Sequence, residues 1–427
     1  MKHTIKEITL SSGTKGILID VPNSEVVNLK LYFRAGYQFG DFEKYETPHL
    51  IEHHILNATK NYPKKNQIMA EFTKNGAGNN ASTGSSFITY IAECAEFEYE
   101  RIFDLMAEVI TKPTFPEAYY ETERENVRTE LTGYLSDYSR QSHILSSQAN
   151  FPSLSMNYSK RIEQLDSITH EDVIDYYRTT HSAHNATFII TGAIAANEAG
   201  IINKLEEIYS ALPAGELREL TDPRGLGQKT PIVSHEDIES GYFYLSWYTE
   251  GGDDFERAVG RILGTILTGG FASLIYGKVR DEGLAYHISS GADVSKHSAS
   301  YGFSAYANPD KLPRLFEIIA KESAKLALNG PTEAELQAAK DLVIGSITLR
   351  TQTTGAIAGW YAGDYAFEGE TQSYDEFFEM LRSVDTKSIQ ALAQKFFLSP
   401  YHSSCYVGPI SEVTALELDN ILEPIWK

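Results

Sequence analysis

The stretch SITHEDVIDYYRTTHSAHNATFIITGAI, residues 167–194, decides the organisation of this chain because a later stretch repeats its pattern. Residues 383–410 read SVDTKSIQALAQKFFLSPYHSSCYVGPI and align with it without a gap, at an offset of 216 residues. Each stretch begins with a helix N-cap, continues as an amphipathic helix and ends in a short strand that reaches Gly192 or Gly408. The shared pattern indicates a duplication.

The same offset relates a second pair of segments. FPEAYYETERENVRTEL, residues 115–131, falls on PTEAELQAAKDLVIGSI, residues 331–347. Two matches at one offset predict a repeat of about 210 residues. A polar stretch rich in Gly and Pro separates the copies, so we expect two homologous domains, 1–213 and 231–427, joined by a linker at 214–230.

Each copy mixes strands and helices. We expect strands at 14–21 and 26–35 to pair with each other, and a third strand at 87–92. Helices are expected at 47–57, 98–111, 116–135 and 170–179. Runs of strands followed by helices, rather than strict alternation, predict an α+β fold in which each domain packs helices on a mostly antiparallel sheet.

The composition limits the classes of function. In the 427 residues no window reaches the roughly 18 consecutive apolar residues of a membrane span. The net charge of −21 repels nucleic acid and anionic membranes, so neither is an expected partner. The N-terminus has no apolar run behind its basic residues, so it does not resemble a secretory signal, and we expect a cytoplasmic protein.

The segment ETPHLIEHHILN, residues 46–57, carries the candidate chemistry. We expect Thr47 to be the N-cap of a helix. His49 and His53 are then one turn apart on one face, which is the geometry that a tetrahedral zinc requires of two imidazoles on a helix. Glu52 borders the same face, where a carboxylate can take a proton from metal-bound water.

A catalytic zinc usually needs a third protein ligand, and the helix expected at 116–135 offers two candidates. Glu123 and Glu130 are two turns apart on an otherwise apolar face, where carboxylates are costly to bury without a cation. The aligned positions of the second copy lack every candidate side chain and hold Thr265, Thr268, Gly269, Ala339 and Ser346. Histidines on helix surfaces are common and an HxxEH pattern also arises by chance, so a structural role is the alternative.

The motif and its spacing resemble the pitrilysin/insulinase family of inverzincin metallopeptidases, in its short, two-domain, processing-peptidase-like branch. The run from His49 to His53 matches the family's HxxEH, and 76 residues separate His53 from Glu130, which is the family's spacing. A second family glutamate precedes this ligand by seven residues and falls on Glu123. The resemblance covers nearly the whole chain and implies the metalloenzyme fold class of LuxS and the processing peptidases.

The resemblance implies one zinc per chain, held by His49, His53 and Glu130. Glu52 would activate a zinc-bound water for attack on a peptide carbonyl. Glu123 would orient a histidine ligand, or would adjust the properties of the metal site without contacting the zinc itself. The implied activity is that of a zinc endopeptidase acting on unfolded peptides.

The resemblance also implies where substrate binds. The family's strand beside the active site is similar to NASTGSSFITY, so an unfolded peptide would add as a further strand along Asn80, Ala81, Ser82 and Thr83. The ligand-free domain, 231–427, would bring Arg280 and Tyr286 to the substrate. The family usually places these two residues seven apart, whereas here they are six apart.

Longer relatives close four such domains around a substrate, so two domains imply a homodimer or a related heterodimer, with domain 1–213 catalytic. One alternative is a partner-activated or non-catalytic subunit of a processing-peptidase-like complex. Another is a maturase dedicated to one precursor peptide. The complete ligand set argues against a non-catalytic copy, and nothing in the sequence separates dedicated maturation from general peptide hydrolysis.

Overall fold

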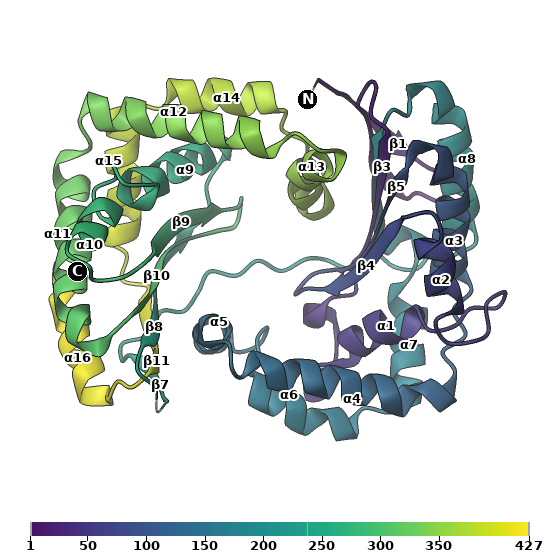
Figure 1. Cartoon of the computed structure of the whole chain (residues 1–427), viewed down its shortest axis with the longest axis horizontal. Coiled ribbons are helices and arrows are strands. Elements are labelled where there is room, and N and C mark those ends of the chain that lie inside the picture. The colour runs from purple at the N-terminus through teal and green to yellow at the C-terminus, as the bar shows by residue number, and fades with distance from the viewer. Residues whose placement is uncertain (1, 237, 426–427) are drawn as a thin grey trace. The chain divides into compact units, whose positions relative to one another are not determined.

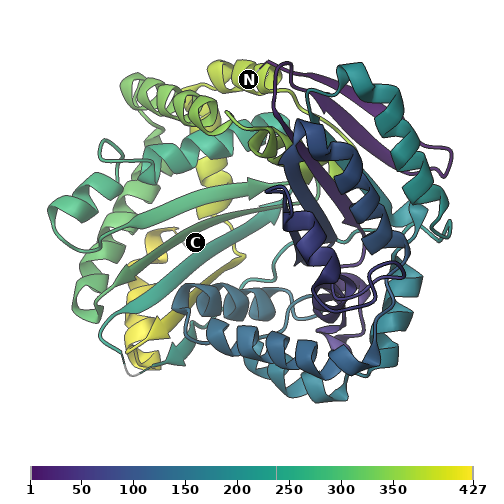
Figure 2. The ribbon, with the colours of Figure 1, turned by 45° about the vertical axis from the view of Figure 1, so that its right-hand side comes forward.

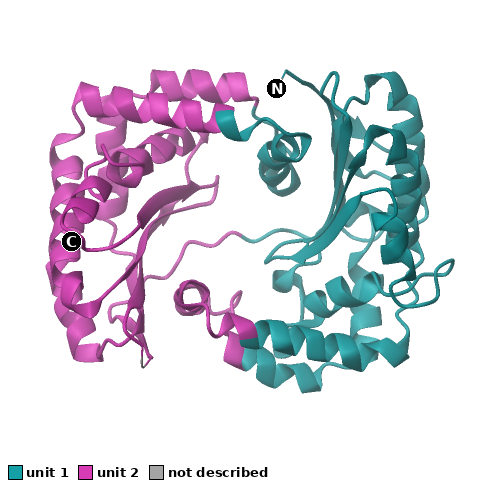
Figure 3. Cartoon of the chain, in the orientation of Figure 1, with its two compact units in different colours: residues 1–132, 160–221, 349–372 teal, residues 133–159, 222–348, 373–427 magenta. Residues whose placement is uncertain are grey.

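The strands form two sheets, each in a separate unit built from three segments of the chain (Figure 3). The computed structural model describes residues 2–236 and 238–425. The first unit comprises Met1–Thr132, Lys160–Thr221 and Leu349–Gln372. The second unit comprises Gly133–Ser159, Asp222–Thr348 and Ser373–Lys427. The chain first crosses from one unit to the other at Thr132–Gly133, and its crossing at Thr221–Asp222 falls within the segment expected to be a linker.

The sheet of the first unit has the strand order β1-β2-β6-β3-β5-β4 (Figure 1). Strands β2 and β6 pair in parallel, and the other neighbours pair antiparallel, as expected for a mostly antiparallel sheet. The strands are β1 (Thr4–Thr9), β2 (Lys15–Asp20), β3 (Val26–Phe33), β4 (Gly78–Thr83), β5 (Ile88–Ala95) and β6 (Ala186–Gly192).

The expected pairing of the strands at 14–21 and 26–35 is wrong, although both strands form. β6 lies between them and pairs with β2 on one side and β3 on the other. This strand is buried along nearly its whole length, including Phe188, Ile189 and Ile190. Because an apolar strand of this kind is most stable with both faces covered, it takes the centre of the sheet, and the two earlier strands pair around it.

Helices cover both faces of this sheet (Figure 1). α3 packs on β5 with α2 and α8 beside it, and α13 packs on β3 and β6 from the opposite face. The helices that contribute to this unit are α1 (Thr47–Ile55), α2 (Gln67–Thr73), α3 (Tyr99–Thr111), α4 (Glu117–Tyr134), α6 (Tyr158–Gln164), α7 (His170–Thr180), α8 (Glu198–Ser210) and α13 (Thr354–Glu368). The helices expected at 47–57, 98–111, 116–135 and 170–179 correspond to α1, α3, α4 and α7.

The sheet of the second unit has the order β7-β11-β8-β10-β9, and its strands lie side by side in the turned view (Figure 2). This is the order of the first sheet without β1. The strands are β7 (Ile232–His235), β8 (Gly241–Glu250), β9 (Ile288–Val294), β10 (Ser298–Ala307) and β11 (His402–Gly408). The helices are α5 (Tyr138–Asn150), α9 (Asp254–Thr268), α10 (Tyr276–Asp281), α11 (Leu312–Asn329), α12 (Glu333–Arg350), α14 (Tyr374–Ser383), α15 (Thr386–Phe397) and α16 (Glu412–Ile421).

The duplication expected from the sequence is confirmed element by element. At the offset of 216 residues, α4 falls on α12, α7 on α15 and β6 on β11. Each copy therefore supplies the strands of one helix-covered sheet, which confirms the predicted α+β fold with two homologous halves.

The copies exchange one helix. α5 belongs to the first copy and packs on β8 and β11 of the second unit. Its equivalent at the same offset, α13, belongs to the second copy and packs on β3 and β6 of the first unit. The compact units thus differ from the sequence halves 1–213 and 231–427, and the assignment of roles to those halves stays a prediction. Across the described helices, none is both long and apolar enough to cross a membrane.

Candidate active site

The helix α1 begins one residue earlier than the expected N-cap implies. Thr47 is its first residue rather than its N-cap, and the Thr47 hydroxyl donates to the carbonyl of Lys44 at 2.7 Å. Glu46 takes the N-cap position, yet its side chain accepts no hydrogen bond from the helix backbone. Pro48 lies in the first turn, where a missing N–H leaves no hydrogen bond unmade.

Three side chains of α1 gather at one place. His49, Glu52 and His53 each present one potential ligand atom, and these atoms lie within 4.8 Å of one another. No other His, Cys, Asp or Glu group in residues 2–236 and 238–425 meets this criterion. The centres of the two imidazole rings are 4.8 Å apart, and the rings lie edge to face rather than stacked.

Glu130 of α4 completes the cluster from a second helix. Its Oε2 lies 3.6 Å from His49 Nε2 and 3.4 Å from His53 Nε2. Two ligand atoms bound to a tetrahedral zinc at about 2.1 Å lie about 3.4 Å apart. Both distances from Glu130 are close to this value, so the donor set fits a zinc ion in both chemistry and spacing.

Glu123 lies one step behind the same cluster. Its Oε2 is 3.7 Å from His53 Nδ1, on the side of the ring opposite the nitrogen that faces Glu130. Lys65 Nζ donates to Glu123 Oε1 at 2.6 Å, and Asn126 Nδ2 donates to Oε2 at 3.0 Å. Burial opposes ionisation, but these partners and His53 lower the pKa of Glu123 to about 2.

Two further polar residues stand behind His49. Its Nδ1 donates to Glu46 Oε2 at 2.8 Å, and the other carboxylate oxygen of Glu46 accepts from Arg161. Sequence reasoning missed Glu46, Arg161, Lys65 and Asn126. The offset of three residues between Glu46 and His49 was a usable signal for Glu46, whereas Lys65 and Arg161 come from distant segments and left none.

The electrostatics of the cluster differ between its acidic and basic members. Burial raises the pKa of Glu52, with His49 and the hydroxyl of Thr83 opposing the shift. Burial lowers the pKa of His49, but hydrogen bonds to Glu130 and Glu46 outweigh it and raise the value to about 9. The carboxylates of Glu130 and Glu46 therefore stabilise positive charge on His49.

The predicted substrate strand is β4, at the edge of the first sheet. Asn80 and Ser82 are exposed, and Ala81 is buried, so the strand alternates across the sheet as an edge strand should. The Thr83 hydroxyl donates to the carbonyl of Pro48 at 3.4 Å, which joins the end of β4 to the first turn of α1. Unpaired backbone groups of an edge strand thus lie next to the histidine helix.

Arg280 and Tyr286 lie together in the second unit. Arg280 Nη1 donates to the carbonyl of Tyr286 at 2.5 Å, and its guanidinium lies 4.5 Å from the centre of the Tyr286 ring. The tyrosine is 84% exposed. The two side chains therefore form one exposed cationic and aromatic group despite the spacing of six residues.

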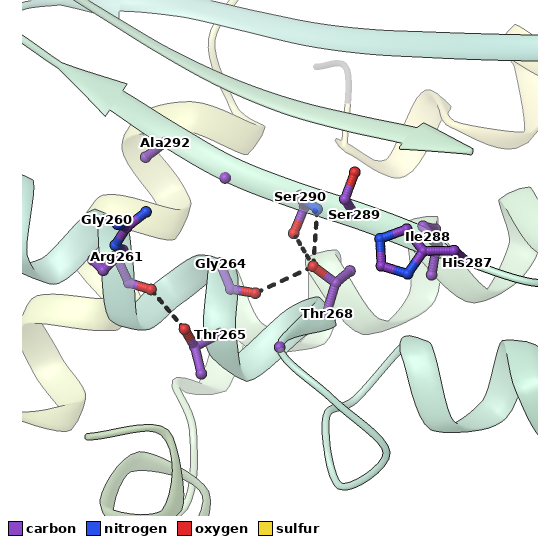
Figure 4. Close-up of a pocket in the computed structure, with 12 residues that line it drawn as sticks. Gly260, Arg261, Gly264, Thr265, Thr268, His287, Ile288, Ser289, Ser290 and Ala292 are labelled. Atoms are coloured by element: carbon purple, nitrogen blue, oxygen red, sulfur yellow. Dashed lines mark hydrogen bonds between the residues drawn. The ribbon is translucent and has the colours of Figure 1, made fainter. Parts of the chain in front are cut away.

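The second unit has no metal-ligand cluster at the corresponding place within its described residues. A pocket of about 180 Å³ lies between α9 and β9 (Figure 4). In the second sheet β9 has the edge position that β4 has in the first, and α9 packs on β9 as α1 packs on β4. Thr268 Oγ1 bonds with Ser290 Oγ at 2.9 Å and accepts from the Ser290 backbone at 2.8 Å. Thr265, at the position aligned with His49, bonds back to its own helix. The Thr268 and Ser290 side chains therefore join helix α9 to strand β9.

Protein-family models match the two halves of the chain separately. The model described as Insulinase (Peptidase family M16) matches residues 16–156, and the model described as Peptidase M16 inactive domain matches residues 167–343. The first range contains all the candidate metal ligands, and the second contains Arg280 and Tyr286.

Curated proteins and solved structures are similar over nearly the whole chain. YmxG of Bacillus subtilis, named an uncharacterized zinc protease, is 23% identical over 93% of this chain and 97% of its own length. The probable mitochondrial-processing peptidase subunit beta of Arabidopsis thaliana is 20% identical over 95% of this chain and 78% of its own length. A protease from Helicobacter pylori has a TM-score of 0.82 at 18% identity, covering 95% of this chain and 100% of that one. This structural likeness establishes the fold.

Proposed function

Because this chain belongs to the insulinase family (peptidase family M16), we propose that it is a zinc-dependent endopeptidase that hydrolyses unfolded peptides. One observation carries the proposal: Glu130 Oε2 lies 3.6 Å from His49 Nε2 and 3.4 Å from His53 Nε2. The Glu130 oxygen on α4 thus meets the Nε2 atoms of two histidines on α1 at the spacing of zinc ligands.

We assign His49, His53 and Glu130 as the residues that would hold one zinc ion per chain. Bound there, zinc would lower the pKa of a coordinated water and polarise a carbonyl oxygen. Glu123 would support His53 from behind, and its partner Lys65 keeps its carboxylate ionised at neutral pH.

Glu52 is the proposed general base. Its carboxylate lies in the same cluster as the two histidines, so it can accept a proton from the attacking water. The water oxygen forms a bond to the peptide carbonyl carbon, and the carbon–nitrogen bond then breaks. The proton held on Glu52 passes to the departing amine, which returns the carboxylate to its starting state.

The proposed substrate site is the free edge of β4. An extended peptide lying along Asn80, Ala81, Ser82 and Thr83 would satisfy backbone groups that the edge strand leaves unpaired. Recognition through the backbone tolerates many sequences but requires an extended chain. This supports unfolded peptides as the substrate class.

Arg280 and Tyr286 are proposed substrate contacts from the second unit, since they form an exposed cationic and aromatic pair. We propose that the active assembly is a homodimer or a related heterodimer, in a cytoplasmic location. Light scattering of the purified chain and cell fractionation test these two statements.

A partner-activated subunit is the second candidate. The observation that favours it is the mutual engagement of Arg280 and Tyr286, because each is held by the other through a hydrogen bond and a ring contact. A relative named as the beta subunit of a processing peptidase supports the same idea. In this case the purified chain would bind zinc but cleave peptides only after a second subunit is added.

The test combines zinc content with digestion of a degenerate peptide library. Wild type should bind zinc and cleave, and Glu52→Gln should keep zinc while its rate falls by about 10²–10⁴-fold. Stoichiometric zinc in wild type with no cleavage of any peptide, alone or with an added subunit, would refute the endopeptidase proposal. Equal cleavage by Glu52→Gln would refute the assigned base.

A further inference from the structure

A buried carboxylate lies directly behind one of the assigned zinc ligands. The Glu46 side chain has no exposed surface, so both of its oxygens need partners within the protein. Oε2 accepts from His49 Nδ1 at 2.8 Å, and Oε1 accepts a short hydrogen bond from Arg161 Nε. The carboxylate therefore bridges the imidazole and the guanidinium.

Arg161 is fixed as firmly as the carboxylate it pairs with. Its Nη2 donates to the hydroxyl of Tyr37 at 2.8 Å. Its guanidinium lies 4.8 Å from the ring centre of Tyr37 and 5.2 Å from that of Tyr45, and the two rings stack on each other at 4.6 Å. A planar cation held by two aromatic rings and two hydrogen bonds has little freedom to turn.

The position of Glu46 in the chain would usually give its side chain another role. At the N-cap of a helix a short polar side chain such as that of Asp normally accepts a hydrogen bond from the first turn. Glu46 makes no such bond, and only its backbone carbonyl accepts from Leu50, at 2.9 Å. The side chain turns instead toward His49, three residues later.

The direction of the hydrogen bond decides which nitrogen of His49 can bind a metal. An ionised carboxylate only accepts, so the proton of a neutral imidazole must sit on Nδ1. The lone pair then lies on Nε2, the nitrogen that faces Glu130. The carboxylate thus selects the tautomer and the ring orientation that a zinc site requires.

We propose that Glu46, anchored by Arg161, is a positioning residue that holds His49 in its metal-binding tautomer and raises the affinity of the site for zinc. This inference rests on the proposed function, since it assumes zinc at His49, His53 and Glu130. It adds a carboxylate–histidine support on the side of the site away from Glu123. Each histidine ligand then has its own carboxylate: Glu46 for His49 and Glu123 for His53.

The test measures zinc affinity of the full chain by competition with a chromogenic chelator. Glu46→Gln keeps the shape of the side chain but removes its charge, and we expect zinc affinity to fall by about 10–100-fold. Glu108→Gln is the matched control, because Glu108 is also buried in the first unit but contacts Asn61 and Lys112. It should leave zinc affinity unchanged.

A second readout follows the proton itself. In zinc-loaded protein labelled with ¹⁵N-histidine, the Nδ1 proton of His49 should exchange slowly with water in wild type and faster in Glu46→Gln. Its signal is identified by its loss in His49→Gln. A purely structural role for Glu46 would lower stability without changing this exchange.

Arg161 gives a variant for the case in which Glu46→Gln does not fold. If arginine acts through the carboxylate, the double variant Glu46→Gln/Arg161→Gln should bind zinc as Glu46→Gln does, and Arg161→Gln alone should weaken zinc binding. Wild-type affinity in folded Glu46→Gln or in Arg161→Gln overturns this inference and leaves the peptidase proposal intact. Absence of zinc binding in wild type would instead overturn the proposed function.

Discussion

Two glutamates on one face of α4 have different environments. Glu130 Oε2 meets the Nε2 atoms of both histidines, whereas Glu123 meets only the rear nitrogen of His53 and is paired with Lys65. The two-turn separation places both carboxylates on the face toward α1 but at different heights along it. The same residue type therefore serves as a candidate ligand in one case and as a support in the other.

Glu130→Gln should lose zinc. An amide oxygen is a much weaker zinc ligand than a carboxylate, so we expect the zinc content of dialysed protein to fall below about one tenth of wild type. Glu125→Gln is the matched control on the same helix, because Glu125 is exposed and pairs with Arg128. Retained zinc in Glu130→Gln would contradict the assignment of Glu130 as a ligand.

A buried histidine away from the cluster makes the first unit sensitive to acid. His181 is 1% exposed, its Nε2 lies 2.7 Å from the hydroxyl of Tyr90, and its ring stacks on Phe33. Thr180 Oγ1 donates to Tyr176, so it must accept from His181 Nδ1. Tyr90 then donates to Nε2, and this hydrogen bond requires the neutral imidazole, because a protonated Nε2 cannot accept.

The free energy of unfolding of the first unit should decrease as the pH is lowered, because of this histidine. Burial lowers the pKa of His181 to about 3, whereas in the unfolded chain it is about 6.5. Between these values the unfolded chain binds a proton that the folded chain does not, so stability is lost as pH falls through this range. Measured by urea unfolding, the free energy of unfolding of wild type should decrease by about 1 kcal/mol more than that of His181→Gln between pH 7 and pH 5.5. Identical losses would contradict this.

At the scale of elements, the exchanged helices show how the units are completed. α13 packs on β3 and β6 although about 160 residues separate it from the nearer strand. Ile357 and Tyr361 are buried on it, and Tyr361 bonds with His3 at 2.6 Å. The core of the first unit therefore depends on a segment from the second copy.

Ile357→Ala should destabilise the first unit. The residue has no exposed surface, and removing a buried isoleucine side chain costs about 2–5 kcal/mol. Hydrogen exchange of β3 and β6 should become faster, while β8 and β11 keep their protection. Leu349→Ala is the control in the same unit, since Leu349 is 79% exposed and the change should cost less than about 0.5 kcal/mol. Slower or unchanged exchange in β3 and β6 would show that α13 does not support this sheet.

At the scale of the whole molecule, the duplicated copies have diverged in chemistry while keeping their architecture. The sheet order of the second unit repeats that of the first from β2 to β4. In place of the histidine cluster it has hydroxyls that bond helix α9 to strand β9. Among the described residues, the second unit has no group of metal-ligand side chains like that of α1.

Zinc should accordingly bind once per chain. Metal analysis of wild type should give about one zinc, and His49→Gln/His53→Gln should give less than about one tenth, since two of the three assigned ligands are lost. Thr265→Ala/Thr268→Ala, at aligned positions of the second copy, should keep the full zinc content. A second tightly bound zinc in wild type, or zinc retained by the double histidine variant, would contradict this assignment.

The sequence alone predicted several of the strands and helices and the metal-site candidates, because their signals are local or periodic. The two histidines lie one turn apart on α1, the two glutamates lie two turns apart on α4, and the duplication repeats at one offset, so each pattern is complete within a short segment or a single alignment. The expected strands and helices form for the same reason.

Only the tertiary structure decided how distant segments meet. The insertion of β6 between β2 and β3, the exchange of α5 and α13, and the pairing of Arg161 with Glu46 each join segments far apart in the chain. These contacts form because apolar strands and charged groups that lose contact with solvent need partners inside the protein. Which partners they meet depends on how the whole unit packs. Residue spacing predicted which side chains could hold zinc, and packing decided which carboxylate supports each histidine.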